Sequence, residues 1–219
     1  MNKPSLVTTM AAGVLAAAAV IAGVPAGPAA ADDCPDVELI FARGTGEPPG
    51  PGRVGQALAD ALGPQLGGRS LDVYGVDYPA SLNFLAAASG ADGAAARIAD
   101  MGARCPQTRL VLGGFSQGAA AVSMLAGVPP VGDRIGSIGS APPLPPDAAG
   151  QIAAVAVFGN PGARFGSPLS TTGAFAGRAI DVCVEGDPIC SAGRDRAAHS
   201  AYELPPYPQQ AAAFVAALL

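Results

Sequence analysis

The stretch "LVLGGFSQGAA", residues 110–120, decides the fold prediction, because it joins a buried apolar run to a helical run through one serine. Ser116 has a glycine two places to either side, in the order "GFSQG". This spacing is typical of a nucleophile elbow, a tight strand-to-helix turn that exposes a serine hydroxyl at the edge of a sheet. Many doubly wound proteins also use glycines at such a turn for packing alone. The stretch by itself leaves both interpretations open.

Apolar runs rich in β-branched residues recur along the chain and predict five buried strands. Helical stretches lie between or after these runs, and the last one closes the domain. The predicted strands are residues 36–42, 71–76, 109–114, 152–159 and 178–184, and the predicted helices are residues 52–66, 90–105, 117–127 and 208–219. The proline-rich residues 127–150 are expected to form an ordered loop within the domain. Alternating strands and helices predict an α/β fold, with a mostly parallel sheet covered by helices on both faces.

The beginning of the chain has the features of a secretory signal. It holds one lysine, then a stretch rich in alanine and valine, and then Ala-Ala-Ala at residues 29–31, which fits the A-x-A cleavage rule. The most apolar part, residues 11–24, is shorter than the roughly 20 residues that a membrane-spanning helix needs. We therefore expect a signal peptide at residues 1–31, a single mature domain at residues 32–219, and no transmembrane segment after cleavage.

The charge balance excludes some classes of partner. The only lysine, Lys3, is lost with the signal, which leaves eleven arginines against seventeen acidic residues and a net charge near −6. An acidic surface without clustered arginines argues against nucleic acid and against anionic membranes as partners. We expect a secreted monomer, either free outside the cell or associated with the cell envelope.

Four cysteines remain in the mature chain: Cys34, Cys105, Cys183 and Cys190. An even number in an exported chain predicts two disulfides, for which three pairings can be drawn. Pairing Cys183 with Cys190 across a short turn is the simplest, and it leaves Cys34 with Cys105. A zinc site is not expected, because the chain has no C-x-x-C motif and only one histidine.

That single histidine, His199, decides whether Ser116 can be a nucleophile. A free serine hydroxyl is a poor attacking group at neutral pH and needs a base. A lone histidine is more often an exposed loop residue, but His199 follows the fifth predicted strand, where an α/β-hydrolase has its histidine. The chain order therefore favours the nucleophile interpretation.

A third group must hold the imidazole, and the order Ser, acid, His limits it to residues 117–198. Asp187 is the preferred acid, because it follows the last predicted strand in "CVEGDPIC", on a tight turn flanked by two cysteines. An aspartate before proline is also a common turn residue. Glu185 is the second choice, and the remaining acids considered are Asp133, Asp147, Asp181 and Asp195.

Oxyanion donors are predicted at two places. The backbone N–H after the nucleophile, that of Gln117, is one of them. The other is Thr45 in "FARGTGEPPG", the loop after the first predicted strand. This glycine-rich loop has neither G-x-G-x-x-G nor G-x-x-x-x-G-K, so we expect no nucleotide there, and the chemistry needs no other cofactor or metal.

The segments "FARGTGEPPG", "GGFSQGAAAV", "CVEGDPIC" and "AAHSAYE" together resemble the cutinases, most closely the secreted cutinase-like proteins of actinobacteria. The resemblance spans nearly the whole mature chain, from Cys34 to the last helix. It implies a small α/β-hydrolase with a five-stranded sheet and no large lid. The roles that it implies are Ser116, Asp187 and His199 as the triad, Thr45 and Gln117 at the oxyanion hole, and Cys34–Cys105 and Cys183–Cys190 as the disulfides.

One departure from the family concerns the substrate. The loop before the histidine tends to be apolar in cutinases that act on plant polyester, whereas here it reads "SAGRDRAAHS". The other expected wall of the site, residues 78–90, supplies apolar candidates: Leu82, Phe84 and Leu85. One apolar and one charged side favour a soluble ester, or a lipid with a polar head, over bulk cutin.

We therefore expect a secreted serine esterase that hydrolyses carboxylic esters with short to medium acyl chains through an acyl-enzyme. Lipid esters and cutin-like polyester belong to the same substrate range. Two alternatives remain open: an acetyl esterase acting on polysaccharide, and a weakly active secreted interaction protein on the same fold.

Overall fold

The computed structural model describes Met1, residues 34–133 and residues 138–219. The chain divides into one unit at Met1–Ala31 and a second, compact unit at Asp32–Leu219. The predicted signal peptide coincides with the first unit and lies outside the described residues apart from Met1. Within the part of the chain that is described, no helix combines the length and the hydropathy needed to cross a bilayer.

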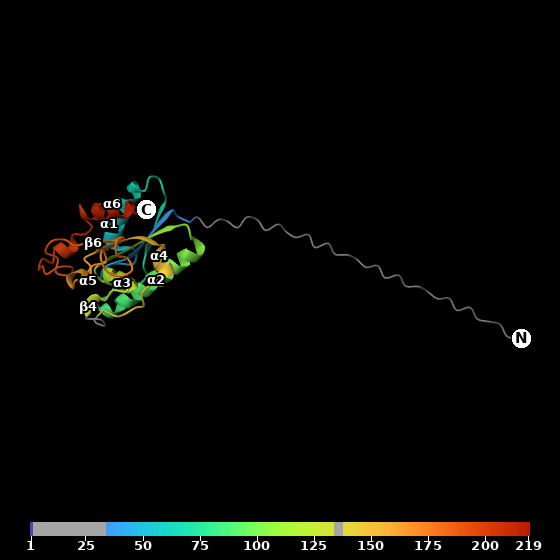
Figure 1. Ribbon diagram of the computed structural model, residues 1–219, viewed down its shortest axis with the longest axis horizontal. Coiled ribbons are helices and arrows are strands. Elements are labelled where there is room, and N and C mark those ends of the chain that lie inside the picture. The colour runs from blue at the N-terminus through green and yellow to red at the C-terminus, as the bar shows by residue number, and fades with distance from the viewer. Residues whose placement is uncertain (2–33, 134–137) are drawn as a thin grey trace. The chain divides into compact units, whose positions relative to one another are not determined.

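The core of the fold is a five-stranded parallel sheet with the strand order β2-β1-β3-β5-β6. Helices lie around this sheet in the compact unit (Figure 1). Its strands are β1 Val37–Ala42, β2 Leu71–Gly75, β3 Arg109–Phe115, β5 Ile152–Phe158 and β6 Ala179–Val182. Each lies within two residues of a predicted strand at both ends, so the predicted fold class is confirmed. Strand β1, which lies next to the central strand β3, is buried along its whole length, because helices cover both faces of this parallel sheet.

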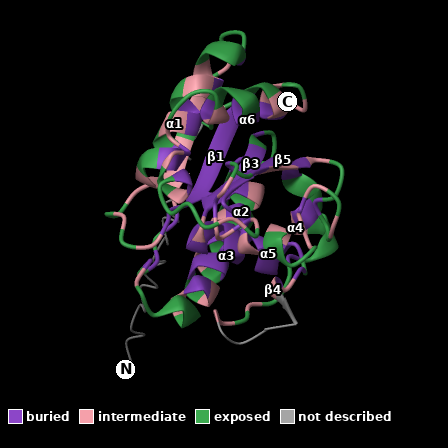
Figure 2. Cartoon of the chain, turned by 90° about the vertical axis from the view of Figure 1, so that its left-hand side faces the viewer, coloured by how far each residue is buried: buried purple, intermediate pink, exposed green. Residues whose placement is uncertain are grey.

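Two helical layers cover the sheet (Figure 2). The helices α1 and α6 pack against each other on one face, and α2 and α3 pack together on the other. Their bounds are α1 Gly52–Leu62, α2 Ala87–Arg104, α3 Gln117–Leu125 and α6 Tyr207–Ala216. Alternate strand residues face the two layers, so each layer closes its own hydrophobic core.

Short elements fill the connections. The segment expected to be a loop, residues 127–150, contains the short strand β4 and the helix α4. Neither was predicted, because pieces of four to six residues carry too little periodicity to be read. The short elements are β4 Pro130–Asp133, α4 Pro146–Gln151, α5 Pro161–Arg164 and the 3-10 helices η1 Gly63–Gln65, η2 Phe84–Ala86 and η3 Ala198–Ser200.

Both predicted disulfides are present. Cys34–Cys105 joins the segment before β1 to the residue after α2, and it spans 71 residues of sequence. Cys183–Cys190 closes a loop directly after β6 and spans 7 residues. Parallel strands end at one common edge of a sheet, so the loops after β1, β3 and β6 converge there, and this second disulfide lies among them.

Candidate active site

Ser116 occupies the turn between β3 and α3 in a backbone conformation that residues other than glycine rarely adopt. Its φ is 53° and its ψ is −110°. Such a conformation costs of order 1–3 kcal/mol and persists only where the surroundings enforce it. The N–H of Ser116 donates to the carbonyl of Phe158 on β5, 2.9 Å away, and this bond ties the turn to the sheet.

The two flanking glycines are required by close backbone packing. A Cβ on Gly118 would lie 1.9 Å from the carbonyl oxygen of Ala42, at the end of β1. A Cβ on Gly114 would lie 2.5 Å from the carbonyl carbon of Gly118. The G-x-S-x-G spacing therefore lets α3 leave the sheet in direct contact with β1, and this contact enforces the strained turn.

The structure brings the three predicted triad residues into one hydrogen-bonded chain. The Oγ of Ser116 lies 2.9 Å from Nε2 of His199, and Nδ1 of His199 lies 2.8 Å from Oδ2 of Asp187. Room for the imidazole comes from Gly159, where a Cβ would lie 2.9 Å from Cε1 of His199. The ring of Phe115 packs against the imidazole, with 5.1 Å between ring centroids.

Asp187 is fully buried and its carboxylate is well bonded. The N–H of Ile189 donates to Oδ1 at 2.7 Å, and the hydroxyl of Tyr202 donates to Oδ2. Burial raises the pKa of Asp187, but the hydrogen bonds from His199, Tyr202 and Ile189 outweigh burial and hold this pKa below its usual value. The carboxylate is therefore ionised at neutral pH, as an aspartate that orients an imidazole must be.

The other acids lie elsewhere. Glu185, the second choice, is exposed. Asp181 accepts hydrogen bonds from the side chain of Asn160 and the N–H of Ser170, and Asp195 accepts from the N–H of Ala197. Of the described acids, Asp187 alone bonds to His199.

Tyr202 is a site residue that the sequence analysis missed. Its side chain is fully buried, and its hydroxyl accepts from the N–H of Val184 at 3.2 Å while donating to Asp187. Burial, followed by the hydrogen bond to Asp187, raises the pKa of Tyr202 far above its ordinary value. The hydroxyl therefore stays protonated and remains a donor. The available signal was an aromatic hydroxyl three residues after the only histidine, in "HSAYE".

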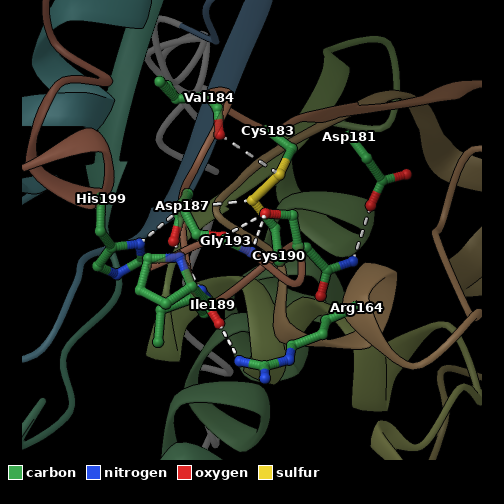
Figure 3. The surroundings of a disulfide bond; sticks show 12 residues. Arg164, Asp181, Cys183, Val184, Asp187, Ile189, Cys190, Gly193 and His199 are labelled. Carbon is green, nitrogen blue, oxygen red and sulfur yellow. Dashed lines mark hydrogen bonds and ion pairs between the residues drawn. A yellow bond between two sulfur atoms is a disulfide. The ribbon is translucent and has the colours of Figure 1, made fainter. Parts of the chain in front are cut away.

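The loop that carries Asp187 is fixed by the short disulfide (Figure 3). The carboxylate lies between the imidazole of His199 and Cys190, whose Sγ is 3.3 Å from Oδ2 of Asp187. The carbonyl of Asp187 accepts hydrogen bonds from both the N–H and the Oγ of Ser191. A covalent link and a tight turn therefore hold the acid in place, without a regular helix.

The loop after β1 carries Thr45 and is anchored by Arg43, which the sequence analysis also missed. The buried guanidinium of Arg43 donates to the carbonyls of Glu47, Val76 and Tyr78, the first two at 2.9 and 3.0 Å. The Oγ1 of Thr45 is buried and has no hydrogen-bond partner among the residues that the structure describes. An unpaired buried hydroxyl is costly, which is expected where a ligand group completes the bonding.

Gln117 is the first residue of α3, so its backbone N–H has no acceptor within the helix. Its side chain reaches the other way: Nε2 donates to the carbonyl of Ser81 at 3.1 Å. The N–H of Gly46 in turn donates to the carbonyl of Ala80 at 2.7 Å, and Ala80 has a φ of 45°. The backbones of the loops after β1 and β2 and of the serine turn are thus tied together around Ser116.

Two hollows open beside Ser116. The smaller, about 170 Å³, is almost wholly apolar, and its lining residues are Phe84, Ser116, Gln117, Ala120, Val131, Ile138, Pro161 and Ile189. The larger, about 410 Å³, lies on the His199 side, and its lining residues are Thr45, Arg53, Leu82, Phe84, Phe115, Ser116, Ile189, His199 and Ser200. Two of the three predicted wall residues, Leu82 and Phe84, line these hollows; Leu85 is exposed and lines neither.

A parallel five-stranded sheet with a serine, a histidine and a buried aspartate bonded in that order at its carboxyl edge defines an α/β-hydrolase. The family model Cutinase matches residues 33–219, and the chain belongs to the cutinase family. It is therefore a serine hydrolase of carboxylic esters, in agreement with the prediction.

Known relatives have similar activities. The phospholipase Culp4 of Mycobacterium tuberculosis is 47% identical over 210 residues, which cover 95% of this chain and 90% of that protein. A Trichoderma reesei cutinase solved with a phosphonate inhibitor has a TM-score of 0.66 and 34% identity, over 86% of this chain and 78% of the other. The catalytic core of an acetyl xylan esterase from the same fungus has a TM-score of 0.72 and 26% identity, over 85% and 100% of the two chains.

Proposed function

We propose that Ser116 is the nucleophile of this esterase, that His199 is its general base and acid, and that Asp187 orients and stabilises the imidazole. The observation that carries this proposal is the continuous chain of two hydrogen bonds, 2.9 and 2.8 Å long, from the serine hydroxyl through the imidazole to a buried carboxylate. The strained turn supports the same assignment, because a serine needed only for packing has no reason to occupy a left-handed conformation.

The reaction follows from these positions. Ser116 Oγ attacks the ester carbonyl carbon while His199 Nε2 accepts the hydroxyl proton. The C–O bond to the alcohol then breaks, and His199 returns the proton to the leaving oxygen. Next, a water molecule gives a proton to His199 and its oxygen attacks the acyl carbon. The bond to Ser116 breaks, the carboxylic acid leaves, and the serine regains its proton.

We propose that the oxyanion of both tetrahedral intermediates is bound by the backbone N–H groups of Gln117 and Thr45 and by the hydroxyl of Thr45. Two observations support this: the N–H of Gln117 begins a helix, and the Oγ1 of Thr45 is buried and unpaired among the described residues. The loss of one such donor typically lowers turnover by about 10² to 10³.

The size of the apolar hollow supports short to medium acyl chains. Its roughly 170 Å³ lie against Ser116 and offer apolar walls but almost no polar surface. A lipid ester is a candidate substrate, since a relative with 47% identity is named a phospholipase. The similarity in fold to an acetyl xylan esterase supports the polysaccharide alternative only weakly. An acetyl group does not need an apolar hollow of about 170 Å³.

We also propose that the chain is exported and cleaved after Ala31. Two disulfides support an oxidising location, and the sequence at residues 29–31 fits the signal-peptidase rule. Determination of the N-terminal sequence of protein collected from the medium and from the cell envelope tests this. A start at Asp32 is expected, and protein that keeps Met1 in both fractions would contradict it.

The enzymatic test is a p-nitrophenyl ester series from acetate to palmitate, run on the wild type and on Ser116→Ala. We expect an optimum at short to medium chains, and a loss of at least about 10³-fold in kcat in the variant. Folded wild-type protein that hydrolyses none of the esters would favour the interaction-protein alternative. Activity on acetate alone would favour the acetyl esterase.

A further inference from the structure

A third hollow, of about 380 Å³, opens beside His199. Its lining residues are Arg164, Pro188, Ile189, Arg196 and His199. It shares Ile189 with both hollows beside Ser116 and shares His199 with the larger of them. The three hollows thus form one cleft around the Ser116–His199 pair. The third hollow, called the third arm of the cleft below, is lined by the guanidinium groups of Arg164 and Arg196.

Neither positive charge in this arm is neutralised by the described part of the protein. Arg196 is exposed and has no hydrogen bond or ion pair with a described residue. Arg164 donates through one nitrogen to the carbonyl of Pro188 and has no carboxylate partner among the described residues; Figure 3 shows it reaching toward the backbone beside Ile189. Two acids of the loop that carries Arg196 are already bonded: Asp195 to the N–H of Ala197, and Asp187 to His199, Tyr202 and Ile189.

A third arginine of the cleft, Arg53, has a structural role that differs from the bonding of Arg164 and Arg196. Arg53 lines the larger hollow, but its guanidinium is bonded to two carboxylates, those of Glu47 at 3.3 Å and of Glu203. It also donates to the carbonyl of Ser200 and therefore braces the loop that carries His199. In a chain with a net charge of −5, the two arginines beside the catalytic histidine have no carboxylate partner among the described residues, unlike Arg53.

The reaction decides which part of the ester enters this arm. The leaving oxygen must lie within hydrogen-bond reach of His199 Nε2, because His199 protonates it. The alcohol part therefore leaves on the His199 side, where the arginines lie. The acyl part then extends into the apolar hollow, which Ser116 and Gln117 line.

We propose that the enzyme prefers esters whose alcohol part carries an anionic group, a phosphate or a carboxylate, and that Arg196 and Arg164 bind this group. The inference rests on the proposed function. The bond that is cleaved remains the carboxylic ester, so the products are the fatty acid and the anionic alcohol with its charged group intact. An acylated glycerophosphate is the simplest substrate of this class, and guanidinium groups bind its phosphate oxygens well.

Three esters with the same butyryl group test the proposal: monobutyryl glycerol 3-phosphate, the butyryl ester of glycolate, and neutral monobutyrin. Acid release gives kcat/KM for each at constant pH and ionic strength. We expect the wild type to prefer the two anionic esters over monobutyrin by roughly 10-fold, since each of the two exposed guanidinium groups contributes roughly 1.5- to 5-fold. Added salt should reduce this preference, because it screens exposed charges.

The variants are Arg196→Gln and Arg164→Gln, with Arg194→Gln as the matched control. Arg194 is an exposed arginine of the same loop and lines none of the three hollows. We expect Arg196→Gln and Arg164→Gln to lower kcat/KM several-fold more for the anionic esters than for monobutyrin, and Arg194→Gln to keep the wild-type preference. Monobutyrin hydrolysis by Arg164→Gln also reports whether loss of the bond to Pro188 has disturbed the loop.

Inorganic phosphate and acetate, added as inhibitors of monobutyrin hydrolysis, distinguish recognition of a free anion from recognition of an anion attached to the alcohol. Weak inhibition by both, with the substrate preference intact, supports the ester form. Equal kcat/KM values for anionic and neutral esters in the wild type, or an equal loss in Arg194→Gln and Arg196→Gln, would overturn the proposal. Failure to hydrolyse any of the three esters would instead contradict the proposed function.

Discussion

The turn that carries Ser116 and the loop that carries Asp187 and His199 meet at one site but hold their side chains by different means. The serine turn is positioned by regular elements: a buried strand, a helix, and backbone contacts that only glycine permits. The acid and histidine loop has one 3-10 helix near its end and otherwise relies on a disulfide, tight turns and the buried hydroxyl of Tyr202.

This difference shows that a preorganised site does not need uniform rigidity from its scaffold. The serine turn requires a defined backbone conformation, and the packing of α3 against β1 fixes this conformation. The imidazole and the carboxylate require a defined orientation, and a few hydrogen bonds fix this orientation. Substitutions in the serine turn should therefore lower mainly the stability of the protein. Substitutions in the acid and histidine loop should lower mainly its activity.

The largest effect is expected from Gly118→Ala in the serine turn. The new Cβ would lie 1.9 Å from the carbonyl oxygen of Ala42, which is backbone and cannot move aside cheaply. We expect a loss of about 3 kcal/mol or more in the free energy of unfolding, together with loss of activity. Gly150→Ala is the control, because its Cβ would meet nothing within 4 Å. Denaturant unfolding measures both variants, and equal stability would contradict the packing account.

The two disulfides differ in their relation to the site: Cys183–Cys190 lies in the acid and histidine loop, whereas Cys34–Cys105 lies outside both regions. In the chain-entropy model the Cys34–Cys105 bridge contributes up to about 4.4 kcal/mol and the Cys183–Cys190 bridge about 2.5 kcal/mol. Replacement of Cys34 and Cys105 by serine should therefore lower the melting temperature more, while the remaining folded enzyme keeps its kcat. Replacement of Cys183 and Cys190 should lower kcat by about 10-fold or more, since it releases the loop that holds Asp187. The reverse pattern would contradict the role of the short disulfide in holding Asp187.

Tyr202→Phe removes one directed bond of the loop at nearly constant volume. We expect kcat to fall by about 3- to 10-fold, because a hydrogen bond to a charged group is lost while the chemistry remains intact. A change in KM alone, with kcat unchanged, would argue against this positioning role.

The same variant should alter the acid sensitivity of the enzyme. The pKa of Asp187 is lowered in the folded protein, so its ionised form stabilises the fold above about pH 4, and this contribution is lost as the pH falls toward the lowered pKa. Loss of the Tyr202 donor brings this pKa back toward its unfolded value, so the variant has a smaller contribution to lose and its stability should approach that of the wild type as the pH falls. Melting temperatures between pH 6 and pH 3 measure this convergence, and parallel curves would contradict it.

The smallest effect is expected on the apolar side of the cleft. Phe84 lines both hollows beside Ser116, whereas its neighbour Leu85 lines neither, although both side chains are exposed. Phe84→Ala should raise KM for medium-chain esters by about 2- to 5-fold through lost apolar contact, and Leu85→Ala should not. Chain-length profiles of the two variants measure this, and identical profiles would remove Phe84 from the acyl site.

The sheet and the serine turn were predictable from the sequence because these segments follow strong local rules. Five continuous apolar runs became the five strands, and the spacing around Ser116 matched a turn that only small neighbours allow. His199 could be identified because it has no competitor, and Asp187 because two cysteines flank it. For these residues, sequence position alone carries the geometric information.

What could not be predicted depends on contacts between distant segments. Tyr202 bonds to Asp187, Arg43 ties the Thr45 loop to the loop after β2, and Arg53 reaches Glu203 over 150 residues of sequence. Apart from the position of Tyr202 close to His199, a single sequence contains no signal for such pairs, since each residue type is ordinary in its local segment. The exclusion of Leu85 from the cleft likewise depends on the direction of a short 3-10 helix, which periodicity does not reveal.

The central claim, that the strained turn presents Ser116 to His199 as a nucleophile, can be tested by covalent labelling. Wild type, Ser116→Ala and His199→Gln are treated with an alkyl fluorophosphonate, and the adduct is located by mass spectrometry of intact protein and peptides. The account predicts one adduct, on the peptide that contains Ser116, none in Ser116→Ala, and much slower labelling in His199→Gln. Labelling of another residue, or equal labelling rates in the wild type and His199→Gln, would contradict it.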